Sequence, residues 1–231
     1  VGGKEIMARI FVVPSADFDK VRAIGARNLA AYLTKYDNLQ RAVVAAYKSA
    51  DGSNQQETVT VNTGDSKAKG LDVEVTWLPT ADLRLGASLN LLDHNYGTAI
   101  LPDLRGTNQP VDISKLNVPF SPKVKAAVNA AYDFNMGSGA KVVLAGDVNY
   151  QSEAEANVFN GLNTQMQKRT LVNLSATWHD PKGRYSVGAY VANVTNEIYR
   201  VAALPVAGLW NFTNYGAPRS YGLNLNVKFG E

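Results

Sequence analysis

The sequence contains no cysteine and only two histidines, His94 and His179. The lack of cysteine excludes a disulfide framework and any thiolate metal site. Neither histidine has a partner at metal-ligand spacing, so the sequence predicts no metal site and no cofactor. A Gly-x-Ser-x-Gly elbow and a phosphate-binding loop are also missing, and no residue is assigned a catalytic role. We therefore do not expect an enzyme.

Long apolar runs and one-sided charge are missing as well. No stretch approaches 18 consecutive apolar residues, which excludes a transmembrane helix. The 23 basic and 20 acidic residues are spread along the whole length, so we expect no nucleic-acid partner. With 231 residues, of which 45% are hydrophobic, the chain can build one large β domain or two small ones.

What the sequence does contain is strict alternation of apolar and polar residues. The clearest case is the last stretch, in which Tyr221, Leu223, Leu225, Val227 and Phe229 alternate with glycine, asparagine and lysine. The same pattern recurs at residues 71–77, 83–91, 124–134, 142–150, 172–178 and 185–191. Alternation gives a strand two different faces. It predicts an all-β fold.

The connections between these runs alternate in length. Short turns at 79–82, 135–139 and 179–183 are expected at one end of the sheet. Long connections at 97–119 and 159–168, and the loop containing Pro205, are expected at the other end. Before residue 71 the pattern is less regular. We expect a strand at 4–13, one extended segment at 21–44, a loop at 47–56 and a strand from 57 with an irregular part at 62–69.

Large aromatic residues end four strands that run the same way. They are Trp77, Tyr132 with Phe134, Trp178 and Phe229. Aromatic rings settle at the membrane–water interface, because one part of each ring is apolar and one part tolerates water. Strands can cross lipid only as a closed barrel, and each needs roughly 9 to 11 residues. The sequence therefore predicts an antiparallel transmembrane β-barrel in which these residues form a membrane-interface girdle.

Two other interpretations fit the alternation alone. One is a self-contained eight-stranded outer-membrane barrel that serves as an anchor. The other is a soluble ligand-binding barrel of the lipocalin type, in which the apolar faces point inward.

Five segments resemble the C-terminal part of the TonB-dependent outer-membrane receptors. They are residues 32–40, 69–80, 118–123, 193–200 and 215–229. In this order and spacing they form a fairly specific signature that covers residues 28–229 and leaves 1–27 poorly defined. The resemblance implies about eight or nine strands of a larger barrel, of the 22-stranded kind with a plugged lumen. The plug domain is absent from this chain, which opens at Val1 without an initiator Met and is expected to be the end of a longer protein.

The resemblance also implies a cellular role. Such receptors lie in the outer membrane and import iron-siderophore complexes or other scarce nutrients. The implied partners are outer-membrane lipid, the TonB energy-coupling complex through a region that this chain lacks, the barrel-assembly machinery and a small-molecule ligand such as a ferric siderophore. The strand from Tyr221 to Phe229 would carry the assembly signal. The family usually ends on the aromatic residue, whereas Gly230 and Glu231 follow it here.

A rigid barrel carries its ligand specificity in its loops. We expect the polar and aromatic residues of the long loops to contact a ligand, with a solvated loop tip as the alternative for each. These candidates are Asp103, Arg105, Asn108, Gln109, Trp210, Asn211 and Tyr215.

Overall fold

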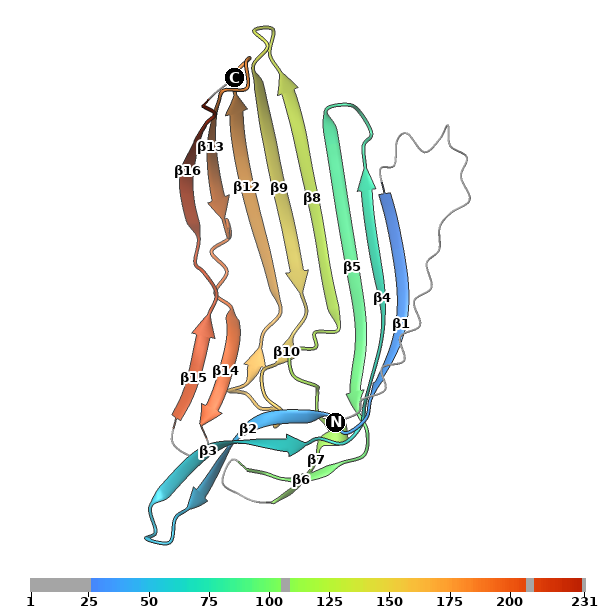
Figure 1. Ribbon diagram of the computed structural model, residues 1–231, viewed down its shortest axis with the longest axis vertical. Coiled ribbons are helices and arrows are strands. Elements are labelled where there is room, and N and C mark those ends of the chain that lie inside the picture. The colour runs from blue at the N-terminus through green and yellow to red at the C-terminus, as the bar shows by residue number, and fades with distance from the viewer. Residues whose placement is uncertain (1–25, 105–108, 207–209, 230–231) are drawn as a thin grey trace.

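The computed structural model describes residues 26–104, 109–206 and 210–229. Eight antiparallel strands form one curved sheet in the order β1–β4–β5–β8–β9–β12–β13–β16 (Figure 1). Their bounds are β1 (Ala26–Tyr36), β4 (Ser66–Trp77), β5 (Leu83–Tyr96), β8 (Val124–Asn135), β9 (Lys141–Gln151), β12 (Arg169–His179), β13 (Tyr185–Ala192) and β16 (Ser220–Val227). Within the described part of the chain, no helix has the length and hydropathy needed to cross a membrane.

Short turns join β4 to β5, β8 to β9 and β12 to β13 at one end of the sheet, which we call the short-turn end. Long connections lie at the other end, the loop end. In their described parts, these connections contain four two-stranded ladders and one 3-10 turn: β2 (Gln40–Lys48) with β3 (Asn54–Asn62), β6 (Ile100–Pro102) with β7 (Pro110–Asp112), β10 (Ala154–Glu155) with β11 (Gln165–Met166), β14 (Arg200–Val206) with β15 (Trp210–Tyr215), and η2 (Ile113–Lys115).

The N-terminal part of the chain departs from the sequence prediction. The single extended segment expected at 21–44 is broken, because β1 ends at Tyr36 and β2 begins at Gln40. Asn38 adopts a φ of 54° in the turn between them, and its backbone N–H donates to the Asp65 carboxylate at 3.1 Å. The loop expected at 47–56 is the tip of the β2–β3 hairpin. The strand expected at 4–13 lies outside the described residues.

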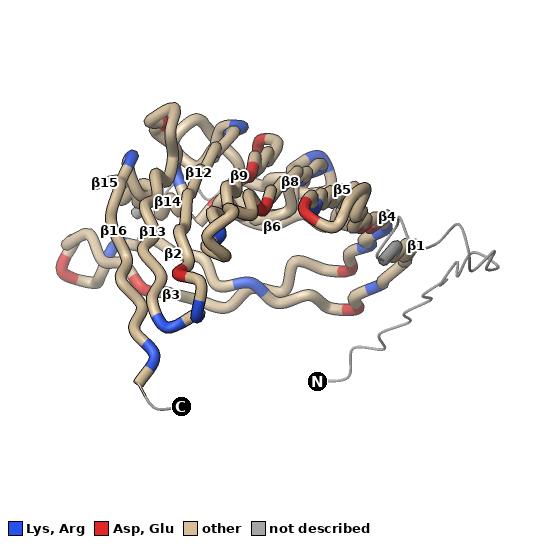
Figure 2. The backbone as a smooth tube through the Cα atoms, turned by 90° about the horizontal axis from the view of Figure 1, so that it is seen from above, with Lys and Arg blue, Asp and Glu red and all other residues tan. Residues whose placement is uncertain are grey.

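The two faces of the sheet differ in polarity and in curvature. Figure 2 shows the strands as an arc, with the β2–β3 hairpin crossing its open, concave side. Tyr96 lies on the polar face of β5 and belongs to one buried cluster with Val43 of β2, so the polar face is the concave one. The apolar face is convex and exposed: Val128 is 58% accessible, and Leu174 is 51% accessible. A lipocalin-type barrel, with apolar faces inward, is therefore the wrong interpretation.

The strand registers line up side chains of the same kind across the sheet. Val128 of β8 is opposite Val148 of β9, which is in turn opposite Val172 of β12. The ladder runs without interruption from β1 to β16, and no pairing joins these two strands among the described residues. The eight strands therefore form an open arc, which does not agree with a self-contained eight-stranded barrel.

A side-chain lock holds the last strand at the loop end. Asn193, with a φ of 50°, donates from its amide to the carbonyl oxygens of Glu197 (2.9 Å) and Ala217 (3.1 Å). Its own backbone N–H donates to the side chain of Asn173 on β12 at 2.9 Å. Next to this lock, the ring of Tyr199 lies so close to Gly216 that an added Cβ would collide with it. The segment 193–200 thus connects β12 and β13 to the start of β16.

Candidate functional site

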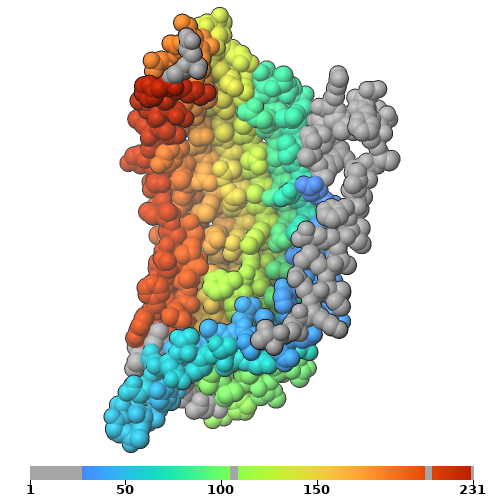
Figure 3. Space-filling view, in the orientation of Figure 1, coloured from blue at the N-terminus to red at the C-terminus, as the bar shows by residue number. Residues whose placement is uncertain are grey.

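The loop end is closed by a packed layer that we call the loop cap, made of residues 39–62, 97–104, 109–122 and 152–168. Its buried apolar residues are Val43, Ile113, Val118, Val158 and Phe159, which pack with Tyr96 at the end of β5. The five cap residues come from three separate connections, and Phe159 is only 1% accessible. Figure 3 shows the β2–β3 hairpin lying across the loop end of the sheet. Because apolar burial is the main stabilising term in folding, this packing fixes the cap.

Hydrogen bonds join the three connections of the loop cap. The backbone N–H of Ala46 donates to the carbonyl of Leu104 at 2.9 Å, and that of Phe120 donates to the carbonyl of Glu155 at 2.8 Å. The backbone N–H of Asn117 donates to the side chain of Asn160. The cap is therefore a preformed structure over the concave face.

Polar side chains cover the concave face below the cap. Asp133, only 8% accessible, accepts from Arg84 at 2.7 Å and from Lys141 at 3.1 Å near the short-turn end. Asn173 donates to Asp147 at 2.7 Å further along the sheet. A face with paired charges and amides suits a water-filled or protein-filled interior. Among the described residues, no group of histidine and carboxylate side chains could hold a metal ion.

The buried edge of the loop cap contains polar atoms without a hydrogen-bond partner. The hydroxyl of Tyr96 is buried beside the Arg41 guanidinium, but neither this hydroxyl nor the Nε of Arg41 makes a well-formed hydrogen bond. His94 lies on the same face of β5, with Nδ1 3.0 Å from the Ser121 hydroxyl and Nε2 3.3 Å from the Ser66 hydroxyl. Sequence reasoning did not identify this group, because its members are far apart in the chain.

The loop candidates that the structure describes fall into two groups on separate hairpins. Asp103 is only 6% accessible, and its backbone N–H donates to the carbonyl of Gln109 at 2.8 Å, so it is not displayed at a loop tip. Gln109 is exposed, while Arg105 and Asn108 lie outside the described residues.

The second group lies on β15, which is a strand of an extended hairpin. Trp210 and Tyr215 are 55% and 53% accessible, and Asn211 is exposed. Trp210 pairs with Val206, and its neighbour on the same face, Phe212, pairs with Leu204. The structure does not bring this group together with Asp103 and Gln109, and their role in ligand binding stays a prediction.

The remaining sequence candidates lie on the convex face. Trp77, Tyr132, Phe134 and Trp178 occupy the short-turn end of β4, β8 and β12, and Phe229 follows β16; the rings of Tyr132 and Phe134 are 4.4 Å apart. Tyr221, Leu223 and Leu225 are exposed on β16, Val227 is half-buried, and this strand pairs with β13 alone among the described strands. Their roles as interface girdle and assembly signal stay predictions.

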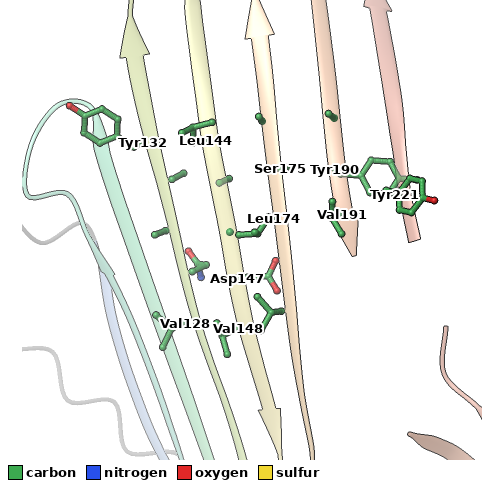
Figure 4. A pocket seen from close by; sticks show the side chains of 18 of the residues that line it. Val128, Tyr132, Leu144, Asp147, Val148, Leu174, Ser175, Tyr190, Val191 and Tyr221 are labelled. Atoms are coloured by element: carbon green, nitrogen blue, oxygen red, sulfur yellow. The ribbon is translucent and has the colours of Figure 1, made fainter. Parts of the chain in front are cut away.

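The convex face also contains an open apolar hollow with a volume of about 910 Å³, shown in Figure 4 from the side opposite to that of Figure 1. Small residues form its floor, and larger ones surround them. The floor is made by Ala130, Gly146, Ala176 and Ala189, and the surround includes Val128, Tyr132, Leu144, Leu174 and Leu223. Such a surface suits contact with hydrocarbon and not a polar solute.

Two carboxylates in turns outside the sheet have a pKa below the ordinary value. The Ser114 hydroxyl and backbone N–H lower the pKa of Asp112 at the start of η2, and the hydroxyl lies 2.5 Å from the carboxylate. The backbone N–H of Tyr185, at 2.8 Å, lowers the pKa of Asp180 in the β12–β13 turn. Both carboxylates stabilise local turns, so neither indicates acid–base chemistry.

Comparison with known proteins agrees with the observed β-sheet architecture. Residues 28–194, more than half of the chain, match the family described as TonB dependent receptor-like, beta-barrel. No curated protein matches the chain.

Solved structures with the same fold include two receptors from Acinetobacter baumannii and one from Yersinia pestis. The ferric preacinetobactin receptor BauA is 20% identical to this chain; the match covers 88% of this chain and 27% of BauA, with a TM-score of 0.58. The siderophore receptor PiuA is 17% identical over 88% of this chain and 26% of its own, with a TM-score of 0.61. The ferric yersiniabactin uptake receptor FyuA is 17% identical over 96% of this chain and 33% of its own, with a TM-score of 0.63. At these identities the likeness shows the fold, and this chain spans about a quarter to a third of each receptor.

Proposed function

Since the chain belongs to the TonB-dependent receptor-like β-barrel family, we propose that it is the C-terminal part of an outer-membrane receptor that imports a ferric siderophore or another scarce nutrient. The eight strands would form one arc of a larger transmembrane barrel, with the convex apolar face in contact with lipid. The family consists of receptors and transporters, not enzymes.

One observation supports this proposal most strongly: the preformed loop cap lies over the polar, concave face. In a barrel the concave face lines the lumen, so the cap would stand at the mouth through which a ligand enters. The cap is fixed by Phe159 and Ile113, which are almost fully buried, and by hydrogen bonds between its segments. A pure membrane anchor has no need for such a structure.

The neighbours narrow the ligand class that should be tested first. Those named above are described as receptors for ferric preacinetobactin, a siderophore and ferric yersiniabactin. We expect the ligand to contact the exposed aromatic residues of β15, Trp210 and Tyr215, because rigid aromatic side chains supply large contact areas at low entropic cost. Energy would come from a TonB complex that contacts a part of the receptor outside this chain.

The test is uptake of radiolabelled iron in cells that make the full-length protein as their only receptor of this kind. Cells are given a panel of ferric siderophores, with and without a functional TonB. We expect uptake of at least one chelate, dependent on TonB, and weaker uptake with Trp210→Ala. The matched control is Met136→Ala, which changes an exposed apolar residue in the β8–β9 turn at the opposite, short-turn end. Correct insertion in the outer membrane with no TonB-dependent uptake of any ferric chelate would refute a ferric siderophore as the ligand and leave only another nutrient; the same result with a panel of other scarce nutrients would refute the proposal.

A further inference from the structure

The ring of His94 joins two different connections at the loop end. Its Nδ1 lies 3.0 Å from the hydroxyl of Ser121, in the loop cap segment before β8, and its Nε2 lies 3.3 Å from the hydroxyl of Ser66, at the start of β4. The ring of Tyr36, the last residue of β1, is close by, with ring centroids 6.1 Å apart. The β2–β3 hairpin leaves the sheet between Tyr36 and Ser66, so His94 lies where this hairpin is rooted.

The hydrogen bonds around the ring assign a neutral form to His94. The Ser121 hydroxyl donates to the carbonyl of Pro119 at 3.2 Å, so it accepts from the Nδ1–H of His94. Nε2 is then the acceptor of the neutral ring, and the Ser66 hydroxyl donates to it. Ser66 is only 3% accessible, and within the described part of the chain its hydroxyl makes no other hydrogen bond. A proton on Nε2 would make both nitrogens donors and leave the Ser66 hydroxyl without an acceptor.

The surroundings of His94 oppose a positive charge on the ring. Partial burial lowers the pKa of His94 most, the Arg41 guanidinium of β2 lowers it further, and the Asp93 carboxylate raises it by less. Asp93 lies on the convex face, where it pairs with Lys69 at 3.0 Å. This charged pair follows the last apolar pair of the two strands, so His94 lies beyond the membrane-spanning part of β5.

The other titratable groups near His94 do not favour its protonation either. Tyr36 and Tyr96 are neutral phenols at ordinary pH. Lys123, at the entry to β8, adds a positive charge, while the two lysines near the ends of β1 and β4 lie on the convex face. Asp37 and Asp65 lie at the root of the hairpin, where Asp65 accepts a backbone N–H at 3.1 Å. Of the described carboxylates, Asp93 is the one that raises the pKa of His94.

The protonation of His94 is therefore linked to the position of the loop cap. Two of the groups around the ring, Ser121 and Arg41, belong to the cap, so lifting the cap exposes the ring to water and restores its ordinary pKa. The open form then binds a proton more readily than the closed form. The stability that neutral His94 gives to the closed cap is fully present above the ordinary histidine pKa, and it is lost as the pH falls through the lowered value.

We propose that His94 is a pH-sensitive switch of the loop cap: when Nε2 takes a proton, the contacts with Ser66 and Arg41 become unfavourable and the cap opens over the concave face. Access to this face would then increase in acidic surroundings. The inference concerns the closed and open forms of the cap, and it does not depend on which solute the protein imports.

The experiment is hydrogen exchange of the full-length protein in detergent micelles, measured by mass spectrometry at the amides of Ala46 and Phe120, which bridge segments of the cap. Rates at about pH 7.5 and about pH 5.5 are corrected for intrinsic exchange; both values lie above the ordinary carboxylate pKa of about 4. We expect exchange to be about two- to tenfold faster at the lower pH, which is roughly one unit below the ordinary histidine pKa. His94→Gln keeps a neutral hydrogen-bonding side chain and should show no acceleration. The matched control His179→Gln, at the short-turn end of β12, should behave as the unmodified protein does.

A second variant, Ser66→Ala, keeps the histidine and tests the switch even where His94→Gln does not assemble. It removes the hydroxyl that donates to Nε2, so the neutral ring is favoured less and the acceleration should be smaller. Three results would overturn the inference: no acceleration in the unmodified protein, the same acceleration in His94→Gln, or the same acceleration in Ser66→Ala. A protein that shows the switch but imports no solute would refute the proposed function alone.

Discussion

A charge placed on the convex face should destabilise the protein far more than the same charge on the concave face. Leu174 and Ser175 are neighbours on β12, so Leu174→Arg and Ser175→Arg place the same side chain on opposite faces. Leu174 is 51% accessible on the convex face and lies against Gly146. Ser175 is exposed on the concave face.

The size of the expected loss of stability follows from how deep Leu174 would lie in the membrane-facing apolar part of the convex face. Leu174 precedes Trp178, at the short-turn end, by four residues, or roughly 13 Å along the strand at about 3.3 Å per residue. With a strand tilt of about 40° the vertical distance is near 10 Å, close to the middle of a band about 25 Å tall. Arginine at the midplane costs about 2 to 4 kcal/mol, whereas lumen positions tolerate charge.

The assay is urea-induced unfolding of the full-length protein refolded into lipid vesicles, followed by tryptophan fluorescence. We expect Leu174→Arg to lower the free energy of unfolding by about 2 to 4 kcal/mol and Ser175→Arg to change it by less than about 1 kcal/mol. A smaller loss at Leu174 than at Ser175, or equal losses, would mean that the faces are assigned incorrectly.

Four further outcomes are expected. Gly216→Ala should cost about 1 to 3 kcal/mol, because the new Cβ would collide with the Tyr199 ring, whereas Gly137→Ala, with nothing within 4 Å, should be nearly neutral in the same unfolding assay. Asn193→Ala should cost roughly 2 kcal/mol, since it removes three side-chain hydrogen bonds and leaves a strained backbone; a stability equal to that of the unmodified protein would refute the lock between β12 and β16. Phe159→Ala should loosen the loop cap by about 3 to 5 kcal/mol, seen as faster hydrogen exchange at Ala46 and Phe120 with the amides of β9 and β12 unchanged; uniform exchange across the sheet would show that the cap is not a separate unit. Asp180 has a lowered pKa, so its stabilisation of the β12–β13 turn is present above its ordinary pKa and is lost as the pH falls through the lowered value; the Tyr185 amide should lose protection on acidification in the unmodified protein but not in Asp180→Asn.

The alternation of side chains was sufficient to predict most of the sheet. The runs around Leu71, Val128 and Leu174 became β4, β8 and β12, because a period of two sorts side chains onto two faces whatever the neighbouring strands are. The lengths of the connections predicted which end carries the long loops. The all-β class and the similarity to the receptor family are both confirmed.

The turn between β1 and β2 could not be predicted in the same way. It contains neither glycine nor proline, and Asn38 keeps its left-handed backbone through a hydrogen bond to Asp65, a residue distant in sequence. Asn38 tolerates the left-handed region, which is a local signal, but the place of the turn is fixed by the tertiary contact with Asp65.

The loop cap was missed for a related reason. Its core joins Val43, Ile113 and Phe159 from three connections, and no periodicity marks them. The apolar residues Leu101, Val111 and Val118 in a connection that otherwise read as hydrophilic were the available signal. The same packing buries Asp103, which the sequence had suggested as an exposed ligand contact.

The central claim is that the apolar convex face meets lipid while the polar concave face meets water. Spin labels are placed one at a time along β8 from Ala126 to Asp133 in the full-length protein in vesicles; this chain has no cysteine of its own, and any cysteine elsewhere in the protein is replaced first. Collision with oxygen, which dissolves in lipid, should peak at Val128, Ala130 and Tyr132. Collision with a water-soluble nickel chelate should peak at the residues between them. Oxygen and nickel profiles that rise and fall together, or a nickel maximum at Val128, would contradict the account.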